Sequence, residues 1–243
     1  MSGRNVISKD VRYEQLVECR KTCSLCSALE NPSRCEQGHY DSRHIGPWSQ
    51  WQGHLNAELM VVGQDWGDTN YFIKNQGREA QRNPTNNMLR ELLGSIGIDV
   101  GSPHDCSSDG QVFLTNAILC LKTNGGLQGD VKKEWFSNCG KAFLRPLIEI
   151  VQPKVTVCLG ERAWRSVTAA FDQPAGRFRD SVENPRGVQI MDGGVAMAVY
   201  HCGARILNMH RRREQQFRDW HRIRKALGYL TTMIGCDDTI SAI

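Results

Sequence analysis

The sequence predicts an α/β fold with a central, mainly parallel sheet of four strands. Four short apolar runs rich in β-branched residues are separated by stretches with helical spacing, which is the pattern of parallel strands joined by helices. Each run ends in a glycine or in a polar side chain. The 243 residues, of which 40% are hydrophobic, suit one core, so we expect residues 1–243 to form a single domain.

The expected elements follow in order along the chain. The predicted strands are residues 58–64, 112–119, 154–159 and 195–200. Spacing and capping residues predict helices over 11–30, from Thr85 to Gly97, over 131–150, from Glu161 onward, and over a basic stretch at about 205–228. Gly, Pro and polar residues predict irregular structure at 31–56, 66–87 and 99–110, a loop at 125–129, a hairpin within 172–194 and a C-terminal tail. Residues 10–56 are expected to form an N-terminal region that opens with a cysteine-bearing helix.

Several functional classes lack their signatures. No apolar stretch approaches the ~20 residues that span a bilayer, and the N-terminus lacks the apolar core of a secretory signal, which predicts a cytoplasmic protein without membrane contact. Neither the dinucleotide motif G-x-G-x-x-G nor the P-loop motif is present, so we expect no nucleotide cofactor. Ten cysteines in such a chain favour metal ligation or buried thiols over disulfides.

Positive charge is concentrated near the C-terminus. Residues 205–225 carry a net charge of +6, whereas the rest of the chain carries −2. Such a block is typical of a contact with a polyanion, although a solvated helix face gives the same pattern.

Polar side chains stand where three of the predicted strands end. Gln64 and Asp65 follow the first strand, Asn116 ends the second, and His201 follows the fourth. Ligands of open α/β sheets bind at the carboxyl ends of the strands, so these residues are expected to line one crevice. A carboxylate can orient water, an amide can read a base edge, and an imidazole can donate to an oxyanion. Each residue alone has a structural explanation as a cap, a turn former or a core histidine.

The cysteines suggest a metal site. Cys23 and Cys26 have metal-ligand spacing, Cys120 follows the second strand, and Cys139 lies on the next helix. Cys19 or Cys35 could replace one of the first pair, and buried free thiols are the alternative for the second.

Taken in this order, the motifs resemble the uracil-DNA glycosylase superfamily. Gly63-Gln64-Asp65 resembles the start of the family-1 motif G-Q-D-P-Y. Asn116 followed by Cys120 resembles the iron–sulfur enzymes of family 4, in which an Asn that reads uracil precedes a cluster cysteine. His201-Cys202-Gly203 stands where H-P-S begins, and Gly67 replaces the family-1 Tyr that rejects thymine.

The resemblance implies a three-layer α/β/α sandwich and a monofunctional enzyme that flips uracil out of DNA and hydrolyses its N-glycosidic bond in base excision repair. Asp65 and His201 would be catalytic. The substrate-binding residues would be Gly63, Gln64, Asn116, Gly67 and, as the stacking ring, Phe72, with Trp66 and Tyr71 as other aromatic candidates. Gly203, Arg205, Arg211 and Arg212 would contact DNA. A structural [4Fe-4S] cluster, or less favourably zinc, would be held by Cys23, Cys26, Cys120 and Cys139.

Three other functions fit parts of the sequence. A non-catalytic DNA binder or damage sensor with the same fold would need neither Asp65 nor His201. A glycosylase for hypoxanthine, xanthine or a modified uracil is compatible with Gly67. An iron–sulfur redox protein would use the cysteines without DNA. The sequence predicts neither the oligomeric state nor the role of residues 30–50.

Overall fold

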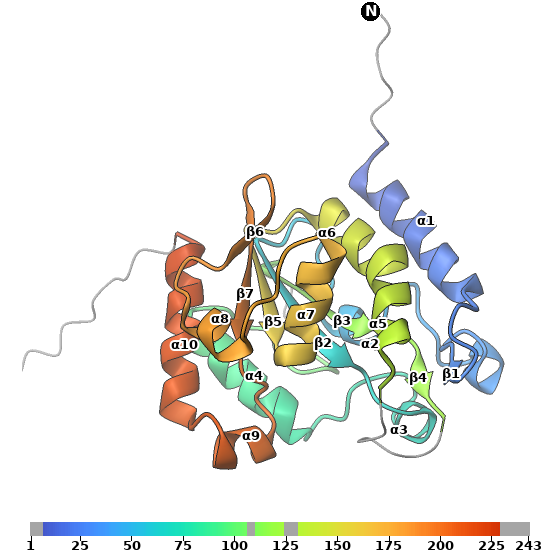
Figure 1. Ribbon diagram of the computed structural model, residues 1–243. Helices are drawn as coiled ribbons and strands as arrows, with labels where there is room; N and C mark the ends of the chain where they lie inside the picture. Colours follow the sequence, from blue (N-terminus) through green and yellow to red (C-terminus); the bar gives the residue numbers. More distant parts are fainter. Residues whose placement is uncertain (1–6, 106–109, 124–130, 229–243) are drawn as a thin grey trace, which may run out of the picture.

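A computed structural model describes residues 7–105, 110–123 and 131–228. The predicted loop at 125–129 and the C-terminal tail lie outside these residues. The main sheet has five strands in the order β3-β2-β5-β7-β6 (Figure 1). Its strands are β2 (Leu59–Asp65), β3 (Val112–Ile118), β5 (Val155–Leu159), β6 (Val188–Met191) and β7 (Gly194–Val199).

Four of these strands are the predicted ones, and they run parallel to one another. The fifth strand, β6, pairs antiparallel with β7 and forms the edge of the sheet. The hairpin expected within 172–194 is therefore only half there: β6 lies in that stretch, but its partner is the strand predicted at 195–200. The prediction of four strands was therefore short by one. The central strands are buried along most of their length because helices cover both faces, which is why they read as continuous apolar runs rather than alternating ones.

Two layers of helices cover the sheet and confirm the three-layer sandwich (Figure 1). One face packs against α1 (Lys9–Thr22), α5 (Lys133–Cys139), α6 (Arg145–Val151), α7 (Glu161–Ala170) and α8 (Phe178–Glu183). The other face packs against α2 (Pro47–Trp51), α3 (Thr69–Lys74), α4 (Pro84–Ser95) and α10 (Arg213–Ala226). A separate two-stranded sheet joins β1 (Leu29–Glu30) to β4 (Leu121–Lys122). None of the described helices has the length and apolar character needed to cross a membrane.

Several predicted helices differ in their bounds. The first ends at Thr22, so Cys23 and Cys26 lie beyond it rather than on it. The helix predicted over 131–150 is α5 and α6 joined through a π-helical turn at Gly140–Leu144. The helices α2, α3 and α8 lie in stretches that the sequence predicts to be irregular, since each has only five or six residues and leaves little periodic signal.

The predicted basic helix over 205–228 is two helices, and that prediction was wrong. Helix α9 (Ala204–Met209) ends before Arg212, whose extended backbone precedes α10. Arg211 lies in this break and turns inward, where its guanidinium binds both carboxylate oxygens of Asp219 at 3.0 and 2.7 Å. Because Asp219 is buried, this bidentate pair fixes the break against α10.

Candidate active site

The polar residues predicted at the strand ends do lie at the carboxyl edge of the sheet. Asp65 ends β2, Asn116 lies near the carboxyl end of β3, and His201 follows β7. In Figure 1 this edge points downward, toward α3 and α9. The parallel register brings Asn116 beside Gly63, and the charge of Asp65 acts on His201, so residues far apart in sequence share this edge.

Asn116 is a largely buried residue, 5% exposed, whose side-chain oxygen lies against Gly63. A β-carbon on Gly63 would lie 2.4 Å from Asn116 Oδ1 and 2.8 Å from the ring of Trp48. Glycine is therefore required at position 63 to leave room for the amide. An amide side chain can donate and accept hydrogen bonds side by side, so in this position it is suited to bind a polar ligand.

His201 is held as a neutral hydrogen-bond donor. Its Nδ1 accepts from the backbone N–H of Gly203 at 3.0 Å, which leaves Nε2 as the protonated nitrogen in the neutral ring. Burial lowers the pKa of His201 below its usual 6.5, and the nearby charge of Asp65 opposes this only in part. The imidazole can thus donate from Nε2 to an oxygen that gains negative charge.

Gly203 supports this geometry, a role that sequence reasoning missed when it assigned the residue to DNA. A β-carbon there would lie 2.9 Å from His201 Nδ1. Gln216 of α10 donates to the carbonyl of His201 at 3.2 Å, and the Cys202 thiol donates to the carbonyl of Thr85 at 3.4 Å. The loop is therefore fixed to α4 on one side and to α10 on the other.

Asp65 has an ion-pair partner that the sequence gave no reason to expect. Lys122 Nζ lies 3.0 Å from Asp65 Oδ1, and both side chains are about nine-tenths buried (10% and 8% exposed). Gln64 donates from Nε2 to Asp65 Oδ2 at 2.5 Å, so its amide is directed to the acid. Lys122 lies on β4, and its backbone N–H also donates to the carbonyl of Gly67 at 3.0 Å.

The aromatic residues after β2 form a packed group. Trp66 lies 5.0 Å from Tyr71 and 5.5 Å from Phe72, measured between ring centroids. Phe72 is 1% exposed and also packs against Tyr40, so its ring presents no accessible face. The structure therefore gives no support to Phe72 as the stacking ring. Gly67 has φ +141°, a conformation that side chains rarely adopt, which accounts for glycine at this position without reference to substrate.

The three arginines predicted to contact DNA have different surroundings. Arg205 and Arg212 are exposed, the first on α9 and the second at the start of α10. Arg211 is paired with Asp219 and lies over the ring of Tyr200. Its guanidinium is thus engaged within the protein, and the prediction that it contacts DNA has no structural support.

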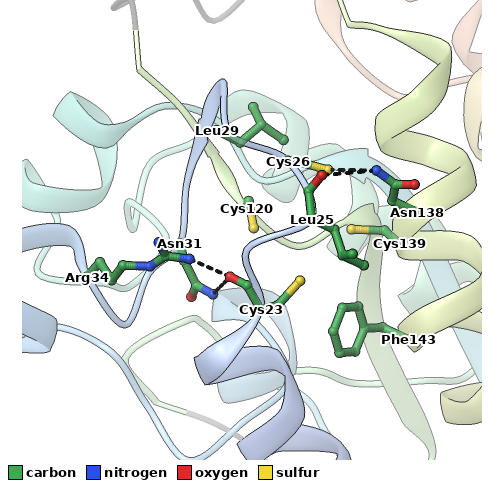
Figure 2. A pocket seen from close by; sticks show the side chains of 10 residues that line it. All are labelled: Cys23, Leu25, Cys26, Leu29, Asn31, Arg34, Cys120, Asn138, Cys139 and Phe143. Atoms are coloured by element: carbon green, nitrogen blue, oxygen red, sulfur yellow. Dashed lines mark hydrogen bonds between the residues drawn. The ribbon is translucent and has the colours of Figure 1, made fainter.

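Four cysteines gather next to β4. Figure 2 shows Cys23 and Cys26 from the loop after α1, Cys120 from the segment before β4, and Cys139 from α5, with their sulfur atoms facing one space. Asn138 donates to Cys26 Sγ at 3.4 Å, and Phe143 closes one side. Cys19 is exposed and Cys35 packs in the other core, so neither lines this pocket.

The chemistry of this pocket favours a positive occupant. Burial raises the pKa values of Cys120 and Cys139 to about 12, and the mutual repulsion of the thiolates contributes. A metal or cluster would reverse this effect, because thiolate ligands are stabilised by the bound cation. Within the described ranges, no group of three or more potential ligands stands in metal-binding geometry. The residue types fit a thiolate-bound group, whereas metal binding itself is not shown.

These features define a class of protein: an α/β protein whose sheet edge carries a buried amide, a neutral imidazole and an ion-paired carboxylate. Residues 50–223 match the model of the Uracil DNA glycosylase superfamily, and the chain belongs to this superfamily. It is also 28% identical over 185 residues to the "Type-5 uracil-DNA glycosylase" of Pyrobaculum aerophilum, covering 74% of this chain and 76% of that protein. The recognition made from the motifs is confirmed, and the protein is a DNA glycosylase of this superfamily.

Proposed function

We propose that the protein excises uracil from DNA as a monofunctional glycosylase. The observation that carries this proposal is the buried Asn116 amide, which lies at the same sheet edge as Asp65 and His201. An amide offers one donor and one acceptor side by side, which complements the O4 and N3–H edge of uracil. The relative named above is a uracil-DNA glycosylase, which supports the same substrate.

A base stacked in a duplex cannot reach this edge, so the nucleotide must flip out at a cost of a few kcal/mol. The exposed Arg205 and Arg212 lie beside the His201 loop and are suited to hold flanking phosphates. Trp66 and Tyr71 are the aromatic side chains near the acid that remain candidates for contact with the base.

Cleavage of the glycosidic bond leaves negative charge on uracil O2 and positive charge on the sugar. His201 donates from Nε2 to O2, and because the ring is already neutral it does so as a hydrogen bond rather than as an acid. A preorganised donor of this kind is worth about 3–4 kcal/mol. Asp65 stabilises the cationic sugar and orients the attacking water.

Lys122 fixes the position of Asp65. Its Nζ atom lies 3.0 Å from Asp65 Oδ1 and holds that carboxylate oxygen in place. The pair also supports monofunctional chemistry, because Lys122 is engaged with Asp65 and would have to leave it to form a Schiff base with the abasic sugar.

Cys23, Cys26, Cys120 and Cys139 would hold a [4Fe-4S] cluster, with a single zinc ion as the alternative. Such a group would supply structural stability by tying the loop after α1 to β4 and α5. It takes no part in bond cleavage.

A second substrate class has one supporting observation. Gly67 contributes no side chain beside the acid, so a base larger than uracil, such as hypoxanthine or xanthine, meets no barrier from this residue. A panel of oligonucleotides that each carry one altered base decides between the two. We expect uracil to be released faster than any other base in the panel. Release of hypoxanthine alone would make hypoxanthine the substrate, and tight binding without any release would indicate a damage sensor.

A further inference from the structure

A buried acid stands behind the active-site edge and is not used by the mechanism above. Glu79 lies between α3 and α4 and is 5% exposed. Its Oε2 accepts from the hydroxyl of Tyr71 at 2.9 Å and from Asn83 Nδ2 at 3.4 Å. The N–H groups of Asn86 and Trp66 lie near enough to favour its charged form, but Asn86 Nδ2 and Trp66 Nε1 make no hydrogen bond within the described residues. Glu79 thus has two hydrogen-bond donors and two further N–H groups nearby.

The neighbours of Glu79 connect two parts of the site. On one side Trp66 directly follows Asp65. On the other side Asn83 Oδ1 caps α4 by accepting from the backbone N–H groups of Thr85 and Asn86 at 3.0 and 3.4 Å. The first turn of α4 in turn contacts the His201 loop, since the carbonyl of Thr85 accepts from the Cys202 thiol.

We propose that Glu79 is a positioning residue: its carboxylate accepts from Tyr71 and Asn83 and thereby holds Trp66, which packs on Tyr71, and the start of α4 in the arrangement that places Asp65 and His201 around the base. The inference extends the proposed function, because its effect on rate is an effect on base release. A protonated Glu79 would present a donor to neighbours that are themselves donors. The network would then lose contacts, and the first turn of α4 would be free to shift against the His201 loop.

The pKa of Glu79 places its change of protonation at a pH where enzyme assays can be run. Burial raises its pKa from 4.5 to about 7, although the hydrogen bonds, first that of Tyr71, oppose the shift. Tyr71 is the titratable side chain in contact with it among the described residues, and its own raised pKa keeps the phenol neutral. Since the folded pKa is raised, the neutral acid is the stable form: the stability that Glu79 contributes is present below about pH 4.5 and is lost as the pH rises to about 7. The carboxylate thus costs stability where it supports activity, a trade-off that is common at functional sites.

The test compares Glu79→Gln with Glu14→Gln, a matched control on the exposed face of α1. In wild type and the control, the single-turnover rate of uracil release should fall as the pH drops through about 7. In Glu79→Gln the rate should be about ten- to a hundredfold lower above that pH and should not change through it, with DNA affinity retained. Tyr71→Phe removes the first hydrogen bond, so its midpoint should move to higher pH. A Glu79→Gln protein that keeps the wild-type rate and midpoint overturns the proposal, as does an unshifted midpoint in Tyr71→Phe.

A second readout does not depend on base release. The fluorescence contributed by Trp66, taken as the difference between the wild-type chain and Trp66→Phe, should titrate with a midpoint at about pH 7 and should not titrate in Glu79→Gln. If uracil is not released but this titration is present, the network stands and the proposed function fails. If uracil is released and Trp66 does not titrate, the proposed function stands and the role of Glu79 fails. Should Glu79→Gln not fold, the Tyr71→Phe midpoint and the wild-type titration decide the question.

Discussion

Removing Lys122 should affect both the stability of the protein and the rate of base release. The Asp65–Lys122 contact is 3.0 Å long and about nine-tenths buried on both sides. At an effective dielectric constant of about 20, two charges at this distance attract by about 5–6 kcal/mol, most of which offsets their loss of hydration. Lys122→Met leaves the buried carboxylate unpaired, for which we expect a loss of about 3–5 kcal/mol in the free energy of unfolding.

A double-mutant cycle isolates the pair. Lys122→Met and Asp65→Asn should each destabilise the protein, whereas the double variant should recover most of that loss because no unpaired charge remains. Chemical denaturation of the four proteins measures the coupling energy. The exposed pair of Lys154 and Glu58 is the matched control, since its side chains are 54% and 42% exposed, and it should show coupling below about 1 kcal/mol. Additive effects at Asp65 and Lys122 would refute the reasoning. In the rate assay, Lys122→Arg should keep more activity than Lys122→Met, because it preserves the charge beside Asp65.

Three further predictions follow from the geometry. Gly63→Ala should lose about 1–3 kcal/mol of stability and weaken uracil binding, because its β-carbon would overlap the Asn116 amide. The control Gly94→Ala lies in helix α4 with no atom within 4 Å, so it should leave binding unchanged and lose no stability. His201→Ala should slow uracil release by about 10²–10³-fold, and in Asp65→Asn the pKa of His201, followed by NMR titration, should fall further because the charge that raises it is gone; an increase would contradict this arrangement. Purified protein should be brown with stoichiometric iron, and Cys120→Ser should lose colour and thermal stability; a colourless protein that contains zinc would replace the cluster with a tetrahedral site.

The sequence predicts the parts of this protein that leave a local pattern. The four parallel strands appear as short apolar runs, and the rule that ligands bind at their carboxyl ends was enough to group Asp65, Asn116 and His201. A hairpin was expected within 172–194, but β6 pairs instead with the strand predicted at 195–200. The four cysteines were expected to meet, and they line one pocket.

What the sequence did not reveal depends on tertiary contacts. Lys122 lies on a two-residue strand with no periodicity, and only folding brings it to Asp65. The break before α10 depends on Arg211 reaching Asp219, which a run of basic residues conceals. Phe72 was a reasonable stacking ring by position, but its burial follows from packing against Tyr40 and Trp66. The sequence does not distinguish Glu79 from surface residues, because a lone glutamate in a polar stretch is usually exposed.

The account centres on Asp65, Asn116 and His201 acting together on one extruded uracil. Single-turnover release of uracil from a uracil-containing duplex, measured for wild type and Asp65→Asn alongside binding of the same duplex, tests it most directly. We predict release by the wild type, and loss of most of that release in Asp65→Asn with binding retained. Unchanged release by Asp65→Asn, or no release by the wild type at saturating protein, would contradict it.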